Sequence, residues 1–358
     1  MSDAAAMGGA MNTDDTTAVR PPSIVRPVQP RREPEAPPRV GRHAPALPLQ
    51  VGTRGSPLAL WQTRHFLASM AEFCPALREM QGFEEQVIAT SGDQVLDRRL
   101  AEIGGKGLFA KEIHEALLDR RVDFAVHSLK DLETELPPGI VLVCVMRRED
   151  ARDALVLADN GTGCHQPWDC LPQGARVATA SVRRQSQLLH ARPDLQVEMI
   201  RGNVQSRLRK LRAEGGPFAT MLALAGLRRM ELEHEASLVI PPEAMLPAAC
   251  QGIVGITARA ADTHLQELLK AIEDRETRAM ATAERALLGA LDGSCRTPIG
   301  GHAVPLPGQR LRLTGLVARA DGSFLARRSL EGDMADAVRL GTELADELRA
   351  LAPADIFC

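Results

Sequence analysis

One cysteine stands in a setting that suits a nucleophile. Cys295 lies between Gly293 and Gly300 in the segment DGSCRTPIGG, which we expect to form a flexible turn after a helix. A thiol on such a turn can reach into a cleft and attack an electrophile as the thiolate. Spacing alone favours the alternative, a free cysteine that is simply packed. The segment therefore indicates a candidate nucleophile and leaves both interpretations open.

A charged pair follows a predicted strand. The run VDFAV leads into HSLKD at 127–131, so Lys130 and Asp131 are expected just past the carboxyl end of the strand, where open α/β sheets bind ligands. Asp131 can act there as a general acid or stabilise positive charge. A solvated charge pair is an equally good interpretation of these two residues.

Arginines open two predicted helices in the second half of the chain. ARVAT meets Ser181 and a helix that starts with Arg183 and Arg184, and LQVEMI meets RGNVQSR, which carries Arg201 and Arg207. Both helix starts direct backbone N–H groups and guanidiniums at one region, which suits several carboxylates or phosphates. A single arginine carries little information, because only five of the 43 basic residues are lysines. The repeated strand–turn–helix setting is what favours a site.

The composition is that of a globular protein with more than one domain. A chain of 358 residues suggests two or three domains, and 44% hydrophobic residues are ordinary. The net charge of −3 gives no general attraction for nucleic acid or an anionic membrane. No apolar run reaches the roughly 18 residues that span a bilayer. Seven cysteines without paired spacing favour a reducing compartment, the cytoplasm, over a disulfide framework.

Residues 1–46 are expected to form a disordered, Pro/Arg-rich tail. The segment PPSIVRPVQPRREPEAPPR has many prolines and charges and little to bury. The start MSDAAAMGGAMNTDD lacks the basic and then apolar pattern of a signal peptide. An organellar transit peptide is the alternative, which fits the arginines but not the acidic residues and prolines.

Two further motifs are interpreted as structural. Cys164, His165 and Cys170 lack a fourth ligand with zinc-site spacing, so no metal is expected there. The basic segment RLRKLR at 207–212 has Leu208 and Leu211 on one helix face and no stacking aromatics, which favours a solvated helix over a nucleic-acid site.

From residue 49 the pattern is that of an α/β fold. LQVGTR places Arg54 at a strand-to-helix turn, where Ser56 and Pro57 are a plausible N-cap and first-turn pair. GGKG at 104–107 precedes a helix expected to carry Phe109, Ile113 and Leu117 on one face.

A second α/β unit is expected after RREDARDAL, including the strand and turn FATMLALAGLRRM, which ends near Arg229. The apolar stretch 239–256 then returns the chain to the first unit, with Gln251 at the crossing. From about residue 275 a helix, the DGSCRTPIGG turn, a hairpin and a final amphipathic helix predict a smaller α+β domain.

Taken together, the motifs are specific. From about residue 49 nearly to its C-terminus the chain resembles the porphobilinogen deaminase family, also called hydroxymethylbilane synthases. The matching segments are TRGSPLALWQ, IGGKGLFAKE, VDFAVHSLKD, REDARDAL, SVRRQ, RGNVQSRL, LALAGLRR, CQGIVGI and ERALLGALDGSCRTPIGG. The last of these is similar to the family's cofactor-attachment signature.

The resemblance implies three α/β domains, the first two like type II periplasmic binding proteins and the third a small α+β domain with the cysteine loop. The expected limits are 47–148 plus 252–271, 152–246, and 275–358. A lid motion at 100–107 is expected, because six pyrroles must eventually fit.

The resemblance also implies the chemistry. The expected enzyme is a transferase that deaminates and condenses four porphobilinogen molecules head to tail into hydroxymethylbilane. Its cofactor is a dipyrromethane primer, held by a thioether to Cys295. Asp131 matches the family's catalytic aspartate, whose carboxylate stabilises the charge that develops as ammonia leaves.

By resemblance, basic and hydroxyl side chains hold the carboxylates of the cofactor and of the growing chain. The residues expected to contact the cofactor are Cys295, Ser128, Lys130, Thr179, Ser181, Arg183, Arg184, Arg207 and Gln251. Those expected to contact the substrate are Arg54, Ser56, Lys106, Arg201, Arg207 and Arg229. No metal, nucleic acid or membrane partner is expected.

Three positions depart from the pattern of the family. Glu102 stands where lysine is usual, Ala180 where serine is frequent, and Glu133 where proline is common. A monomer in the cytoplasm, with hand-over of product to the next pathway enzyme, completes the expectation. The competing functions are a non-catalytic anion-binding protein with the same cleft and an arginine-rich nucleic-acid-binding protein, whose affinity would fall steeply with salt.

Overall fold

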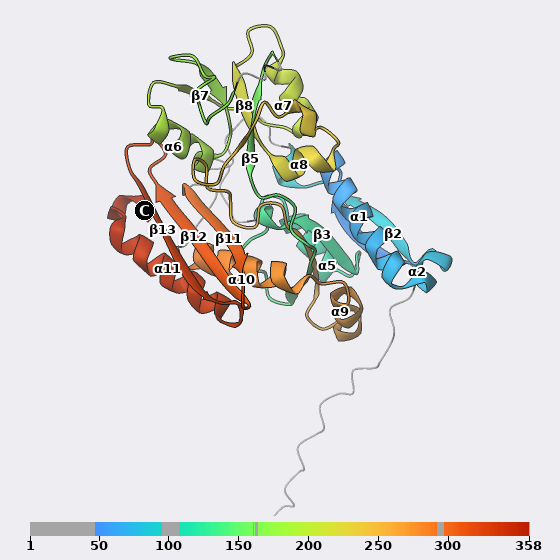
Figure 1. Cartoon of the computed structure of the whole chain (residues 1–358). Helices are drawn as coiled ribbons and strands as arrows, with labels where there is room; N and C mark the ends of the chain where they lie inside the picture. Colours follow the sequence, from blue (N-terminus) through green and yellow to red (C-terminus); the bar gives the residue numbers. More distant parts are fainter. Residues whose placement is uncertain (1–46, 95–106, 160, 162–163, 292–296, 358) are drawn as a thin grey trace, which may run out of the picture. The chain divides into compact units, whose positions relative to one another are not determined.

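The structure, a computed structural model, describes residues 47–94, 107–159, 161, 164–291 and 297–357. These residues form three β-sheets with helices packed against them (Figure 1). The predicted α/β class, with a small sheet domain at the C-terminal end, is confirmed. The predicted tail, residues 100–106 of the predicted lid, which include Glu102 and Lys106, and Cys295 lie outside the described residues.

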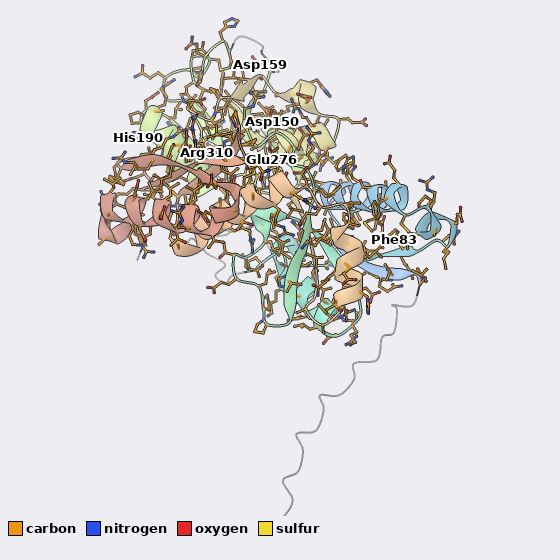
Figure 2. The ribbon with its side chains drawn as sticks, turned by 60° about the horizontal axis from the view of Figure 1, so that its bottom comes forward. Phe83, Asp150, Asp159, His190, Glu276 and Arg310 are labelled. Carbon is orange, nitrogen blue, oxygen red and sulfur yellow. A yellow bond between two sulfur atoms is a disulfide. The ribbon has the colours of Figure 1, made fainter. Side chains whose placement is uncertain are left out.

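The first sheet has the strand order β2-β1-β3-β10-β4. The neighbours β2, β1 and β3 are parallel, whereas β10 is antiparallel to both β3 and β4. Its core is aliphatic with a few aromatic rings, such as Phe66 and Phe124, which meet edge to face at 5.8 Å between centroids. Phe83 starts the edge strand and is labelled in Figure 2. The strands are β1 (Leu49–Arg54), β2 (Phe83–Ile88), β3 (Phe124–Ser128), β4 (Ile140–Val145) and β10 (Val254–Arg259).

The second sheet repeats this plan with the order β7-β6-β8-β5-β9. The strands β7, β6 and β8 are parallel, and β5 is antiparallel to β8 and β9. The chain enters the second sheet from the first at β5, and it returns to the first sheet at β10. Each of these strands is the fourth in the order of its sheet. The strands are β5 (Asp153–Leu157), β6 (Arg176–Ala178), β7 (Gln196–Glu198), β8 (Ala219–Ala223) and β9 (Leu238–Ile240).

The chain therefore passes between the two sheets twice. The first crossing runs over residues 146–152, between β4 and β5, and the second over residues 241–253, between β9 and β10. We call these segments the first and second crossing. Gln251 lies in the second crossing, as predicted from the apolar stretch 239–256.

The third sheet is an antiparallel meander of β11 (Ile299–Leu306), β12 (Arg310–Ala318) and β13 (Leu325–Asp333). The helices α10 and α11 pack against each other and against this sheet (Figure 1). The α-helices within the described residues are α1 (Pro57–Phe73), α2 (Pro75–Glu79), α3 (Ser91–Gln94), α5 (Lys111–Leu118), α6 (Val182–Ala191), α7 (Val204–Leu211), α8 (Leu224–Arg229), α9 (Thr263–Lys270), α10 (Arg275–Ala290) and α11 (Ala337–Leu351).

Two helix limits differ from the prediction. Phe109 precedes α5 rather than lying on its face, because the chain forms a turn over residues 107–110 before the helix begins at Lys111. The segment LAGLRR, expected as a turn, forms the short helix α8, whose Leu224 and Leu227 are buried. Apolar contact on one side of this segment favours the helix over an open turn.

A buried carboxylate joins the third sheet to both crossings. Glu284 on α10 is fully buried, and its Oε1 lies 2.5 Å from Nη1 of Arg148 in the first crossing. Its oxygens also accept the backbone N–H of Cys250 in the second crossing (2.5 Å) and of Ala303 on β11 (2.6 Å). Removing one partner of such a buried ion pair strongly lowers the stability of the folded protein.

The Glu284→Gln variant is expected to lose about 3–5 kcal/mol of unfolding free energy, because it leaves Arg148 buried without its counter-ion. Urea unfolding followed by circular dichroism measures the loss. The matched control is Glu276→Gln, which changes an exposed carboxylate on the first turn of the same helix and should lose less than about 1 kcal/mol. Equal stability of the two variants would contradict a structural role for the Glu284 charge.

The cysteines differ from the prediction at one place. Cys164 and Cys170 form a disulfide, with their Cα atoms 5.0 Å apart. Trp168 between them adopts φ 72°, so the loop turns back on itself and brings the two thiols together, which linear spacing does not reveal. Cys74, Cys144 and Cys250 are free. Among the described residues, no helix is both long and apolar enough to cross a membrane.

Candidate active site

Leu129 anchors the turn that carries Asp131. Strand β3 ends at Ser128 and continues into a single 3-10 turn, Leu129–Asp131. Leu129 is buried, and its backbone N–H donates to the carbonyl of Ile253 in the second crossing at 2.9 Å. Lys130 and Asp131, the two residues that follow Leu129, are exposed. The turn therefore presents an amine and a carboxylate from a fixed backbone.

Lys130 is linked to the second sheet through an amide. Its Nζ donates to Oε1 of Gln251 at 3.2 Å, and Nε2 of Gln251 donates to Oδ1 of Asp153 at 2.8 Å. Surrounding protein lowers the pKa of Lys130 to about 8; Asp131 opposes this shift, and Arg184 adds to it. Although Lys130 has accessible surface, we attribute the shift to the protein atoms and cations packed around its amine.

Arg183 and Arg184 converge on one carboxylate. Nη1 of Arg183 lies 2.8 Å from Oδ2 of Asp153, and Nη2 of Arg184 lies 2.7 Å from Oδ1. Both guanidiniums also donate to backbone carbonyls, of Leu246 and Met221 respectively. Burial works to raise the pKa of Asp153, but the two guanidiniums outweigh it and hold that pKa far below its usual range.

Two more arginines extend the positive region. Burial lowers the pKa of Arg207 to about 10; Arg184 and Arg201 add to this shift, and Asp131 opposes it. Arg207 also donates from Nε to the carbonyl of Gly202 at 2.8 Å. Arg201 is buried, and its Nη2 lies 3.4 Å from the carbonyl of Gly92 in α3. Arg207 thus interacts electrostatically with Asp131, Arg184 and Arg201, so these charges lie in one neighbourhood.

Arg54 at the end of β1 makes its own contacts. Its Nε donates to Oδ2 of Asp93 at 3.1 Å, and its guanidinium carbon lies 4.2 Å from the ring centroid of Phe109. Burial would raise the pKa of Asp93, but hydrogen bonds from Arg54 and Thr90 outweigh it and lower the pKa. Asp93 and Phe109 hold this arginine between an anion and an aromatic face.

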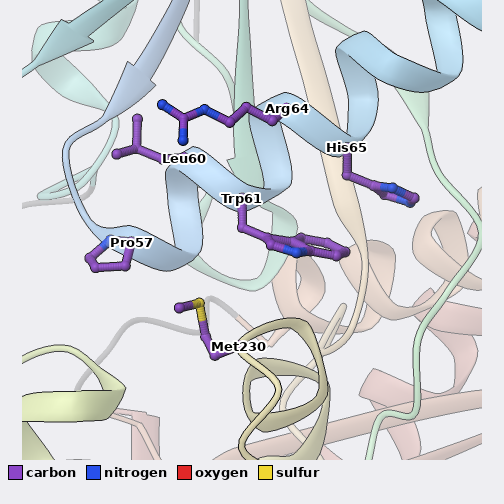
Figure 3. Close-up of a pocket in the computed structure, with 6 residues that line it drawn as sticks. All are labelled: Pro57, Leu60, Trp61, Arg64, His65 and Met230. Carbon is purple, nitrogen blue, oxygen red and sulfur yellow. The ribbon is translucent and has the colours of Figure 1, made fainter.

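Arg229 contacts Trp61, which lines the pocket drawn in Figure 3. Its Nη2 donates to the carbonyl of Gly252 at 2.7 Å, and its guanidinium carbon is 5.8 Å from the ring centroid of Trp61. Burial lowers the pKa of Arg229 to about 10, against the effect of Glu149. The pocket, of about 540 Å³, contains none of the predicted site residues; it is lined by Pro57, Leu60, Trp61, Arg64, His65 and Met230 (Figure 3).

The predicted hydroxyl residues are engaged within the protein. Ser56 caps α1 by accepting the N–H of Ala59 at 3.3 Å, and Ser181 caps α6 by accepting the N–H of Arg184 at 3.4 Å. The hydroxyl of Thr179 accepts the N–H of Ser181 at 3.2 Å. Ser128 donates to Oε1 of Gln62 at 2.9 Å. These contacts shape the turns that carry the charged residues.

The structure brings some predicted residues together more closely than others. Lys130, Gln251, Arg183 and Arg184 share one network of contacts, and the charges of Asp131, Arg201 and Arg207 act within the same neighbourhood. Arg54 and Arg229 contact other partners. The prediction missed Asp153, although the quoted segment REDARDAL contains it at the start of a strand.

The site has the features needed by an anionic cofactor. Nε of Arg183 is buried and has no hydrogen-bond partner among the described residues, so it can donate to an acceptor that the chain does not supply. Guanidiniums and an amine gathered around one carboxylate carry excess positive charge. The residues present therefore fit a ligand with several carboxylates. Fold and candidate site together are those expected of an α/β protein that binds polyanionic small molecules.

Comparisons with known proteins agree with this class. Residues 49–267 match the family model "Porphobilinogen deaminase, dipyromethane cofactor binding domain", and residues 279–350 match "Porphobilinogen deaminase, C-terminal domain". A porphobilinogen deaminase of Paracoccus denitrificans is 48% identical over 316 residues, which cover 87% of this chain and 97% of that protein. That of Sorangium cellulosum is 47% identical over 84% of this chain and 98% of its own. The chain belongs to the porphobilinogen deaminase family.

Similar solved structures were also found. One is the substrate binding protein of an amino acid ABC transporter, with 12% identity, a TM-score of 0.35, and coverage of 65% of this chain and 94% of that one. Another is a periplasmic binding protein from Brucella ovis with glutathione bound, with 14% identity, a TM-score of 0.36, and 68% of each chain covered. These scores are too low to support a conclusion about this chain.

Proposed function

We propose that the chain is a transferase that deaminates porphobilinogen and joins four units head to tail into hydroxymethylbilane. The observation that carries the proposal is membership of the porphobilinogen deaminase family across nearly all of the described residues. The convergence of Lys130, Arg183 and Arg184 supports it, because each pyrrole unit brings acetate and propionate groups that need cationic partners. A non-catalytic anion-binding protein is the competing function.

In this proposal the cofactor is a dipyrromethane held by a thioether to Cys295. When bound, it supplies the electron-rich pyrrole carbon to which new units are joined. Ser128, Lys130, Thr179, Ser181, Arg183, Arg184, Arg207 and Gln251 surround it and hold its carboxylates in place. For Ser128, Thr179 and Ser181 the contribution includes fixing the turns, since their hydroxyls already bond within the chain.

The substrate is held by a second set of basic groups. Arg54, Ser56, Lys106, Arg201, Arg207 and Arg229 are assigned to it. Asp131 is the catalytic residue: its carboxylate accepts a hydrogen bond from the pyrrole N–H and stabilises the positive charge that develops as the C–N bond breaks and ammonia leaves. The negative charge of Asp131 is therefore the essential property, rather than its size.

Intact mass spectrometry and a turnover assay test the function. Full-length protein isolated from cells that make porphobilinogen is expected to be heavier than its chain by one dipyrrole unit. Supplied with porphobilinogen, it should release ammonia and a linear tetrapyrrole in a ratio of four to one. Protein of unmodified mass that binds porphobilinogen but releases no ammonia would favour the competing binding protein.

The proposal extends to organisation and location. We propose domain limits of 47–148 plus 252–271, 152–246, and 275–358, which divide the chain among its three sheets. We further propose a monomer in the cytoplasm that hands its product to the next enzyme. The free thiols of Cys74, Cys144 and Cys250 support a reducing compartment, whereas the Cys164–Cys170 disulfide argues against one.

A further inference from the structure

Asp153 holds an unusual position among the charged residues of the site. It is the first residue of β5, directly after the first crossing, and it has no exposed surface. Its two oxygens are divided between two guanidiniums: Oδ2 faces Arg183 at 2.8 Å and Oδ1 faces Arg184 at 2.7 Å. Two adjacent buried guanidiniums repel each other strongly unless an anion lies between them.

The same carboxylate is linked to Lys130, in the turn Leu129–Asp131, through the side-chain amide of Gln251. Gln251, itself buried, donates from Nε2 to Oδ1 of Asp153 at 2.8 Å and accepts from Nζ of Lys130 at 3.2 Å. Lys130 follows β3 of the first sheet, and Arg183 and Arg184 lie on α6, which follows β6 of the second. One anion thus connects three cations, and two positive charges remain in excess within this group.

Arg183 keeps a donor for another partner. Nε of Arg183 is buried without a hydrogen-bond partner among the described residues, and the contact of its Nη1 with Oδ2 is an ion pair rather than an aligned hydrogen bond. Asp153 therefore pairs fully with Arg184 but leaves Arg183 with a donor still free. Donors left in this state match a ligand with several carboxylate oxygens.

We propose that Asp153 is a positioning residue that preforms the carboxylate-binding site before the pyrrole primer arrives. It holds Arg183 and Arg184 side by side and offsets one of the three positive charges. The two charges left over attract the ligand. This inference rests on the proposed function, because it takes the anionic primer to be the ligand.

The Asp153→Asn variant tests the charge, since the amide has nearly the same size. Without the anion, the three cations repel one another, and the primer-free protein loses stability. Primer carboxylates then replace part of the missing charge. The fall in melting temperature is therefore expected to be clearly larger for primer-free than for primer-loaded protein. A residue that merely filled the core would lower both melting temperatures equally.

A second measurement follows the loading of the primer. Full-length protein made in cells that lack porphobilinogen is incubated with porphobilinogen, and the loaded fraction is followed by intact mass. Asp153→Asn is expected to load at least tenfold more slowly, and Asp153→Glu, which keeps the charge, to recover part of the rate. Both readouts are independent of turnover by the loaded enzyme.

Binding of pyrrole carboxylates should also depend on pH in a defined direction. Lys130, which faces Asp131, Asp153, Arg183 and Arg184, is charged below its pKa of about 8 and loses its charge as the pH rises through that value, so the affinity of the primer-free protein for pyrrole carboxylates should fall above pH 8. Because the charge of Asp153 raises the pKa of Lys130, the fall should begin at lower pH in Asp153→Asn.

Asp150→Asn is the matched control. Asp150 lies in the first crossing, is labelled in Figure 2, and pairs with Arg152 at 2.6 Å rather than with Arg183 or Arg184. Its loading rate and pH profile should equal those of the wild type. The inference is overturned if Asp153→Asn loads at the wild-type rate, if both of its melting temperatures fall equally, or if it folds in neither state. A wild-type chain that never gains mass instead contradicts the proposed function.

Discussion

Replacement of Asp131 by alanine is expected to lower kcat about 10²- to 10⁴-fold while the protein keeps its fold and its primer. The backbone of the turn is held by Leu129, which is buried and donates to Ile253, so the Asp131 side chain contributes little to folding. Asp131 retains accessible surface, and substitutions at such positions usually change stability by about 0.5 kcal/mol or less. Steady-state kinetics and a melting curve separate the two effects.

The asparagine variant decides what Asp131 supplies. Asparagine keeps the shape and one hydrogen-bond acceptor but not the charge, so Asp131→Asn should be nearly as slow as the alanine variant. Glu135→Gln removes an exposed carboxylate four residues along the same loop and should keep wild-type kcat. Substantial activity in Asp131→Asn would show that the negative charge is unnecessary, and the assigned role would then be wrong.

Replacement of Cys295 by serine is expected to abolish both the mass increment and turnover. A hydroxyl is far less nucleophilic than a thiolate at neutral pH, so serine should not form the ether that would replace the thioether. Turnover should fall to the limit of detection, because the growing chain has no anchored starter. Intact mass and ammonia release measure the two losses separately.

The free cysteines among the described residues provide the controls. Burial raises the pKa of Cys144 and of Cys250 to about 12, in each case with a nearby glutamate adding to the effect, so neither is a thiolate at neutral pH. Cys74 is half-buried between α1 and α2. Cys74→Ser should therefore keep the full mass increment and full activity. A Cys295→Ser protein that still carried the dipyrrole would place the attachment elsewhere.

Much of the fold could be predicted from local pattern. Alternation of short apolar runs with helical periodicity predicted the α/β class, and the Ser56-Pro57 pair predicted the start of α1, where Ser56 caps the helix. The failures concerned two short segments. The start of α5 depends on a turn that apolar spacing does not encode, and the helical state of LAGLRR depends on burial by residues distant in sequence.

Most of the candidate site was predicted by resemblance, and its electrostatic organisation was not. Arg183 and Arg184 were expected to face a ligand, whereas the structure shows both already paired with Asp153. An aspartate at the start of a strand gives no signal of such a role, because its partners lie about 30 residues away, with separations of 30 for Arg183 and 31 for Arg184. The Cys164–Cys170 pairing was missed for a similar reason, since it depends on a loop reversal at Trp168.

The double passage of the chain between the first two sheets limits how they can move. A single connection would allow one sheet to twist freely against the other. Two connections restrict this twist, so the easy motion is a hinge bending about the line that joins the first and second crossings. Glu284 connects the third sheet to both crossings. If the first two sheets move apart to make room for a longer pyrrole chain, we expect the movement to be transmitted through Glu284 to β11, which follows the segment that bears Cys295. The length of the product and the position of its anchor are then mechanically connected.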